Sequence, residues 1–200
     1  MQPFFEKNGY QLNAVLQQFR RYSEGGFTNI IFSPSYYDDC QILEVSFGSR
    51  INLVEESIMP FSNGINGYRE ESNTSITNLS QYHGIKNYRY KIFDEASHNE
   101  ALEELCNFFE QDGFSFLNSL TDIPRLEALF NAKPEEKNPL AFNQQLRCFR
   151  GMALAALTQN PDRADLKVRY LRLLQRYRTA EVIIERFERF AQHLSQISYN

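Results

Sequence analysis

The residue types that most often carry out chemistry in proteins, histidine and cysteine, are few and widely spaced in this chain. Its 200 residues include three histidines, His83, His98 and His193. None of them lies three or four residues from another His or a Cys, which is the spacing that places two metal ligands on one face of a helix. We therefore expect neither a metal site nor a cofactor.

The three cysteines, Cys40, Cys106 and Cys148, are also far apart, and each has apolar neighbours. An odd number without Cys-x-x-Cys spacing argues against a disulfide framework and against a zinc site. We expect reduced, inert thiols, with Cys106 and Cys148 facing the core, and hence a cytoplasmic protein. The first residues do not resemble a secretion signal, and no segment has the roughly 18 apolar residues of a membrane span, so we expect no membrane association.

Carboxylates offer a second route to chemistry, because five acidic pairs occur along the chain. They are Asp38-Asp39, Glu55-Glu56, Glu70-Glu71, Asp94-Glu95 and Glu103-Glu104. Adjacent side chains on a strand point to opposite faces, so a pair alone cannot chelate an ion. There is also no Gly-rich phosphate loop and no Gly-x-Ser-x-Gly motif. These absences favour a non-enzymatic protein. The alternative is a hydrolase whose carboxylates converge with His83 or His98 in a concave pocket.

An arginine-rich segment is the sharpest feature of the sequence. Arg169, Arg172 and Arg176 recur at helical spacing, opposite a stripe of Leu and Tyr. They are our candidate binding residues, for a phosphate backbone or for an acidic protein surface. The simpler interpretation is a solvated helix face that pairs with the acidic first part of the chain. Nucleic acid is the less favoured partner, because the isoelectric point near 5.5 is below the basic range of nucleic-acid binders.

The charges are unequally distributed along the chain. Residues 141–200 carry ten basic and five acidic side chains, a charge of +5, whereas residues 1–140 carry 11 basic and 20 acidic, a charge of −9. Such polarity steers a charged partner, or else allows the two parts to neutralise each other by packing.

The elements that must position these residues fall into two blocks. A helix is predicted over 9–22, with Leu12, Val15, Leu16 and Phe19 on one face, followed by strands at 27–32 and 41–47. Residues 50–59 are ambiguous between strand and other structure, and 60–75 have the turn signals of a loop. Two further strands at 74–82 and 87–93 are expected to pair with each other across His83-Gly84. The many Phe and Tyr residues predict an aromatic core.

The second block is helical. Capping-box spacing at Ser97 begins a helix that Gly113 should break, and Pro124 begins a shorter one. Polar residues 131–138 form a linker, Pro139 starts the next helix, and 162–197 is one long helix or two with a bend near Thr179. The order predicts an α+β fold: an N-terminal helix, an antiparallel sheet of four to five strands, and a C-terminal block of four to five helices. We expect one domain, 1–200, with 1–131 and 139–200 as an alternative subdivision.

Four short segments of the sequence resemble segments of known proteins. They are Ala101-Leu-Glu-Glu-Leu105, Gly113-Phe-Ser-Phe-Leu-Asn-Ser-Leu120, Arg150-Gly-Met-Ala-Leu-Ala-Ala156 and Asn160-Pro161. Together they resemble small bacterial domain-of-unknown-function proteins, some of them similar to immunity proteins of polymorphic toxin systems, over about a third of the chain. The resemblance implies a strand block followed by a helix, a short turn and a late helix pair, and it brings no site residues. We expect a non-enzymatic protein-interaction module whose binding surface is either the acidic 60–75 region or the Arg face of the C-terminal helix. If the protein neutralises a toxin, an acidic patch that opposes a basic enzyme is the expected mode of binding. The oligomeric state is open, because the apolar excess of the last helix fits either a core or a dimer seam.

Overall fold

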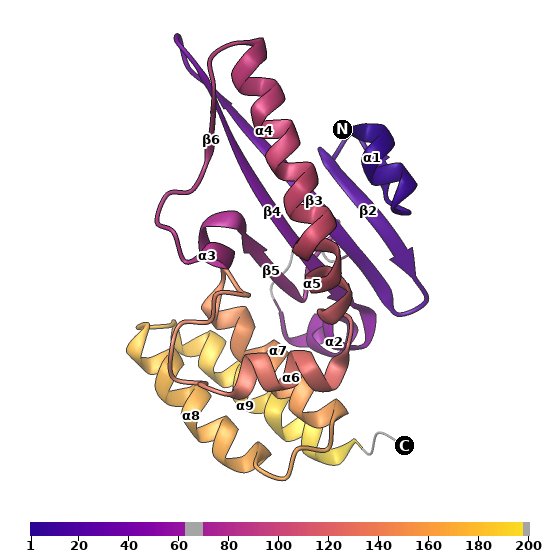
Figure 1. Ribbon diagram of the computed structural model, residues 1–200. Helices are drawn as coiled ribbons and strands as arrows, with labels where there is room; N and C mark the ends of the chain where they lie inside the picture. Colours follow the sequence, from indigo (N-terminus) through magenta and orange to yellow (C-terminus); the bar gives the residue numbers. More distant parts are fainter. Residues whose placement is uncertain (63–69, 198–200) are drawn as a thin grey trace.

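The computed structural model describes residues 1–62 and 70–197, and it confirms the predicted α+β class (Figure 1). The chain begins with the short helix α1 (Gln2–Lys7) and then forms a sheet. The strands are β1 (Gln11–Asn13), β2 (Gln18–Ser23), β3 (Gly26–Tyr36), β4 (Gln41–Ile51), β5 (Ser75–Asn78) and β6 (Tyr90–Ile92).

Helices account for most of the remaining chain. They are α2 (Asn52–Ile58), α3 (Leu79–His83), α4 (Glu95–Phe108), α5 (Phe114–Ser119), α6 (Ile123–Asn131), α7 (Gln144–Leu157), α8 (Arg163–Arg176) and α9 (Glu181–Gln196). A single turn of 3-10 helix, Met59–Phe61, follows α2. Of the two alternatives for residues 162–197, one long helix or two, the structure has two, because α8 and α9 are separate helices on either side of Thr179.

The sheet is antiparallel in the order β1-β2-β3-β4-β5, and β6 also pairs with β4. β5 pairs with the segment from Ser46 to Ser49 and β6 with the segment from Gln41 to Leu43, so the two short strands follow one another along one edge of β4. The prediction that they pair with each other is wrong. Asn78 caps α3 by accepting a hydrogen bond from the Gln81 amide, and Gly84 ends the helix at a φ of 67°, so a helix separates the strands where a hairpin was expected.

The predicted helix at 9–22 is also wrong, because this segment forms the hairpin of β1 and β2. All of β2 pairs with β3, and Phe19 enters the core opposite Ile30. Val15 lies exposed in the connecting turn, which Gln17 closes at a φ of 50°. Pairing with a long central strand therefore outweighed the helical spacing of the apolar residues. The N-terminal helix is instead α1.

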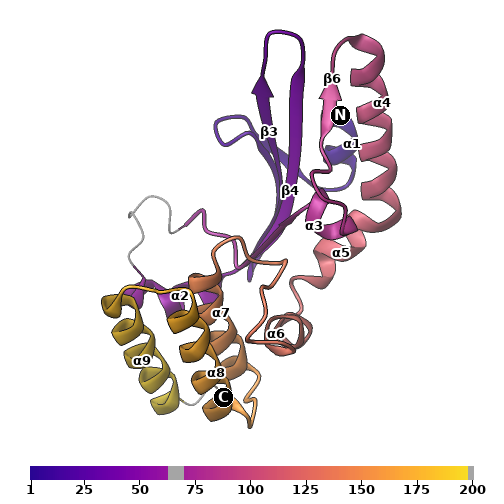
Figure 2. The same ribbon diagram turned by 90° about the vertical axis from the view of Figure 1, so that its left-hand side faces the viewer.

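Helices α1, α4 and α5 cover one face of the sheet (Figures 1 and 2). The buried rings of Phe5, Phe19, Phe47 and Phe109 meet there, with centroids 4.7 Å apart for Phe5 and Phe19 and 5.8 Å apart for Phe47 and Phe109. The expected aromatic core is confirmed. Such edge-to-face and tilted pairs stabilise a core beyond the area they bury.

Gly113 does not break the helix that precedes it. A π-helical turn, Phe109–Gly113, continues α4 into α5, and Gly113 keeps a helical φ of −59°. A Cβ at this position would lie 2.5 Å from Cδ1 of Phe109, so close packing of that ring requires the glycine. The start of α4 also differs from the prediction: Asp94 is the N-cap, and Ser97 is the third helical residue of a capping box.

Helices α6 to α9 form a block at one end of the sheet (Figure 2). α7 begins at Gln144, five residues after the predicted start at Pro139, because the Asn143 side chain accepts hydrogen bonds from the amides of Gln145 and Leu146 and so caps the helix there. Buried apolar side chains form one contiguous cluster that extends from Phe5 to Leu194. The apolar stripe of α9, including Phe187 and Phe190, belongs to this cluster.

Candidate functional site

The histidines and cysteines lie apart from one another. His83 and His98 are both exposed, and the ring of His83 contacts those of Tyr82, Tyr88 and Phe108. Neither histidine lines the two larger hollows described here, one of about 910 Å³ between α8 and α9 and one of about 720 Å³ beside the start of α7. Across residues 1–62 and 70–197, no three His, Cys, Asp or Glu side chains gather in a metal-binding arrangement.

The thiols are free. Cys148 is buried, and burial raises its pKa to about 12. Cys40 and Cys106 are partly exposed, so the expectation that Cys106 faces the core holds only in part, and desolvation is the largest cause that raises the pKa of each. All three therefore stay protonated at neutral pH, as expected for unreactive cysteines.

The structure brings Arg169, Arg172 and Arg176 together around one residue, Glu135 in the loop after α6. Nε of Arg169 and Nη1 of Arg172 lie 3.6 and 3.8 Å from the Glu135 carboxylate, and Arg176 donates a hydrogen bond of 3.0 Å to its main-chain oxygen. The three arginines thus hold the loop against α8. Their role in binding a partner stays a prediction.

The same loop is held from inside by Arg147, whose side chain is 1% exposed. Its guanidinium donates to the carbonyls of Phe130 (2.7 Å), Lys133 (3.0 Å), Pro134 (3.3 Å) and Glu136. These carbonyls lie at and beyond the C-terminus of α6, where the helix dipole favours a cation. Sequence reasoning missed this residue, since an isolated Arg in an amphipathic helix looks like a solvated side chain.

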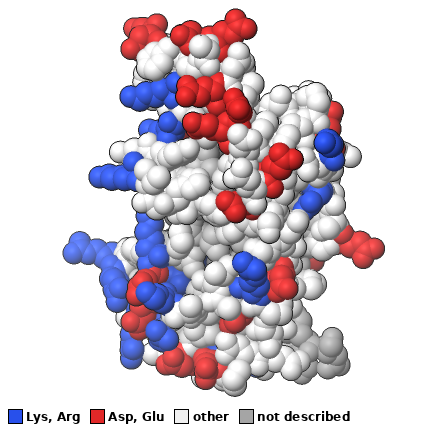
Figure 3. Space-filling view, in the orientation of Figure 1, with Lys and Arg blue, Asp and Glu red and all other residues white. Residues whose placement is uncertain are grey.

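A continuous acidic surface covers the outer side of α4 and the turn beside it. Exposed carboxylates on this surface are Asp38, Asp39, Glu95, Glu100, Glu103, Glu104, Glu110 and Asp112. Within the described part of the chain, none of them forms an ion pair. Figure 3 shows acidic side chains gathered at the top of the molecule and along α4, and basic ones along the left edge and below.

Three exposed aromatic side chains lie at the upper end of this surface. Tyr36 is 78% exposed, and Tyr37 and Phe93 are each 60% exposed. Their rings contact no other ring among the residues that the structure describes. We call these three residues, together with Asp38, Asp39, Asp94 and Glu95, the acidic–aromatic tip. Large exposed rings are a feature of interfaces, where they supply much of the binding energy.

The local fold explains why these residues come together. Tyr36 pairs with Gln41 at the end of the β3–β4 hairpin, and the amide of Tyr37 donates to the carbonyl of Cys40 at 2.9 Å. Gln41 in turn pairs with Ile92 of β6, which brings Phe93 beside the hairpin. The turn of the long β3–β4 hairpin and the start of α4 lie at the same end of the molecule (Figure 1), so the rings and acids that they carry belong to one end as well.

Asp94 has a structural task within the tip. Its carboxylate accepts hydrogen bonds from the hydroxyl and amide of Ser97, at 2.7 and 2.8 Å. These bonds, the hydroxyl's first, lower the pKa of Asp94 below its ordinary value, so the group stays ionised. The capped helix start therefore holds Phe93 and Glu95 in a fixed position.

A signal for this surface was present in the sequence and was missed. Residues 92–124 contain eight acidic side chains and no Lys or Arg. Taken pair by pair, the acids do not reveal this surface, and the acidic region predicted at 60–75 lies partly outside the described residues, at 63–69. Counting charge over that whole stretch would have identified α4.

The opposite face of the sheet carries a buried polar cluster. Oε1 of Gln18 accepts hydrogen bonds from Arg20 (3.1 Å) and from Asn29 (2.7 Å), and Asn29 accepts one from Asn73 (2.8 Å). Arg20 also pairs with Glu71. Because these groups satisfy one another, the cluster attaches the segment that enters β5 to the sheet.

Comparison of the chain with protein-family models, with curated proteins and with solved structures gave no match. In the part of the chain that the structure describes, no helix has both the length and the apolar character that crossing a membrane requires.

Proposed function

We propose that this protein is a non-enzymatic protein-interaction module that binds a basic protein partner through the acidic–aromatic tip. The observation that carries the proposal is the coincidence of unpaired carboxylates with the exposed rings of Tyr36, Tyr37 and Phe93 at one end of the molecule. Desolvated aromatic anchors give binding energy, and surrounding charge gives orientation and speed of association.

The extended acidic surface on α4 supports a basic partner in particular. Carboxylates without ion pairs create a negative potential that attracts a cationic surface over about 8 Å at physiological salt. A neighbouring acidic protein would be repelled. The resemblance to immunity proteins fits this mode, since neutralising a basic toxin enzyme requires such a surface and no chemistry.

A cytoplasmic location belongs to the same proposal. It rests on the three free thiols, which reducing compartments maintain. We also propose that the chain acts as one domain, since a single apolar cluster joins its two blocks.

The proposal is tested by capture from a lysate of the native host at low salt with three matched baits. They are the wild type, a tip variant (Asp38→Asn, Asp39→Asn, Phe93→Ala) and a control variant (Glu24→Gln, Glu181→Gln, Tyr22→Ala). The control residues are also exposed, and Glu24 and Tyr22 lie at the opposite end of the 11-residue strand β3, about 35 Å away.

The expected result is a basic protein that the wild type and the control retain and the tip variant loses, identified by mass spectrometry. Equal retention by all three baits would contradict the proposal. So would a captured protein of acidic isoelectric point, because the tip would repel it.

A further inference from the structure

A second surface, distinct from the acidic–aromatic tip, has the opposite charge. Its centre is the hollow of about 720 Å³ beside the start of α7, lined by Lys137, Phe142, Asn143, Gln144, Gln145 and Tyr177. Phe142 comes from the loop before α7 and Tyr177 from the C-terminal cap of α8, so the tertiary fold alone brings the two rings to one hollow.

Both rings are available to a ligand. Phe142 is 48% exposed and Tyr177 is 42% exposed, and neither contacts another ring in residues 1–62 and 70–197. Exposed faces of this kind stack on flat, π-bonded groups.

The hollow also offers polar groups between its rings. Oδ1 of Asn143 is occupied as the helix cap, which leaves its Nδ2 as a donor, and Gln145 donates from Nε2 to Thr179 at 3.2 Å, which leaves its Oε1 as an acceptor. A donor and an acceptor beside an aromatic wall match the edge of a nucleobase.

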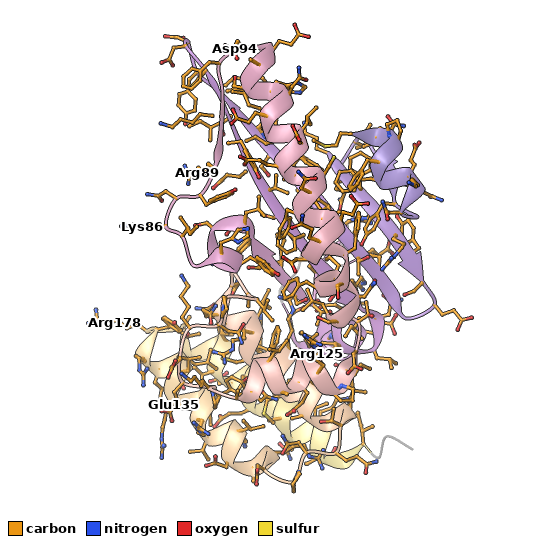
Figure 4. The ribbon with its side chains drawn as sticks, viewed as in Figure 1. Lys86, Arg89, Asp94, Arg125, Glu135 and Arg178 are labelled. Carbon is orange, nitrogen blue, oxygen red and sulfur yellow. The ribbon has the colours of Figure 1, made fainter. Side chains whose placement is uncertain are left out.

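Cations flank the hollow on both sides. Lys137 lines it, and Arg176 and Arg178 immediately precede and follow Tyr177. Lys137 and Arg178 are exposed, and neither has an ion-pair partner among the described residues. Figure 4 shows Arg178 projecting from the same edge of the molecule as Lys86 and Arg89, and in Figure 3 basic side chains gather along this edge, with acidic ones among them in its lower half. We call Lys86, Arg89, Lys137, Arg176 and Arg178 the basic edge.

We propose that the hollow and the basic edge bind a single-stranded nucleic acid, with one base stacked on Phe142, another on Tyr177, and the phosphates along the basic edge. Aromatic platforms within a cationic track are the physical basis of single-strand binding. A duplex would hide its base faces. The acidic surface on α4 would repel the strand, and this confines binding to one edge although the whole chain is acidic.

The test is fluorescence anisotropy with a labelled uridylate oligomer of about ten nucleotides, which falls within the site sizes of known single-strand binders. We expect Phe142→Ala and Tyr177→Ala each to weaken binding about tenfold. Lys137→Ala and Arg178→Ala should each reduce the slope of log affinity against log salt by about 0.7. Matched controls are Tyr22→Ala and Arg125→Ala, both exposed, with Arg125 placed away from the basic edge in Figure 4.

Several results would overturn this inference. One is the absence of any anisotropy change at the lowest salt, and another is unchanged binding by the Phe142→Ala and Tyr177→Ala variants with their circular dichroism spectra intact. A third is a competition experiment in which uridine monophosphate displaces the labelled oligomer as effectively as the unlabelled oligomer does. A strand that contacts the whole basic edge must bind more tightly than a single nucleotide. The tip variant should bind the oligomer like the wild type, so this proposal and the proposed function fail separately.

Discussion

Arg150 on α7 holds Glu55 on α2 in a two-point contact, with Nε 2.8 Å from Oε1 and Nη2 3.1 Å from Oε2. Both side chains are buried. α2 follows directly from the central strand β4, whereas α7 lies in the helical block, so this pair joins the two halves of the molecule.

Removing one partner of this pair should destabilise the protein strongly. Glu55→Ala leaves the Arg150 charge buried and unpaired, and we expect the free energy of unfolding in urea to fall by about 3–5 kcal/mol. The double variant Glu55→Leu, Arg150→Met should recover most of this loss, since it leaves no buried charge. The matched control is Glu44→Ala, which breaks the half-exposed pair with Arg89 at 2.9 Å and should cost less than about 1 kcal/mol. Similar losses for Glu55→Ala and Glu44→Ala would refute the structural role.

Arg147 should be equally intolerant of change, although no carboxylate of the described residues pairs with it. Arg147→Met fills a similar volume but leaves the carbonyls of Phe130, Lys133 and Pro134 without their donor. We expect a loss of about 2–5 kcal/mol in the same urea experiment. We also expect faster amide hydrogen exchange in the loop that carries Glu135. Unchanged exchange in this loop would show that other contacts hold it.

The sequence predicted the class of the fold and the order of its two blocks, because helical and alternating periodicities are local properties. It failed at 9–22, where a helical spacing of Leu12, Val15 and Leu16 belonged to a hairpin with exposed side chains. It failed again at β5 and β6, since strand partners are chosen by a third strand far away in sequence.

The sites were predictable only in part. The clustering of the three α8 arginines followed from helix geometry, but their convergence on Glu135 depends on a loop held by Arg147, which no local pattern reveals. Predicting the acidic–aromatic tip would have required the register of the strands. Phe93 lies close to the hairpin only because Gln41 pairs with both Tyr36 and Ile92. The acidic character of α4, by contrast, was available from a charge count.

The three thiols should differ in reactivity. Burial raises the pKa of Cys148 to about 12, so at mildly alkaline pH only a very small fraction is thiolate. In the folded protein a disulfide reagent such as Ellman's reagent should modify Cys40 and Cys106 well before Cys148. All three should react in denaturant, and the variant Cys148→Ala should show the same fast phases as the wild type. Equal rates for all three thiols in the folded state would contradict the assigned burial.

The N-cap of α4 makes the stability of the folded protein depend on pH, and the direction of this dependence follows from the pKa of Asp94. The pKa of this carboxyl is lower in the folded protein than in the unfolded chain, because Ser97 donates two hydrogen bonds to the ionised form. Its stabilising effect is therefore present above the unfolded pKa and is lost as pH falls through the folded one. Asp94→Ala should lower the unfolding temperature at neutral pH, and the difference from the wild type should shrink in acid. A constant difference across the acid range would exclude this origin.

The most direct test of the central claim is the association rate constant between this protein and the basic partner captured by the tip, measured over a range of salt concentrations. We predict fast association at low salt that slows steeply as salt rises, because unpaired carboxylates steer the encounter. Asp38→Asn with Asp39→Asn should slow association and flatten the salt dependence, whereas Glu24→Gln with Glu181→Gln should change neither. An association rate that is independent of salt, or equally affected by both pairs of substitutions, would contradict recognition through the acidic–aromatic tip.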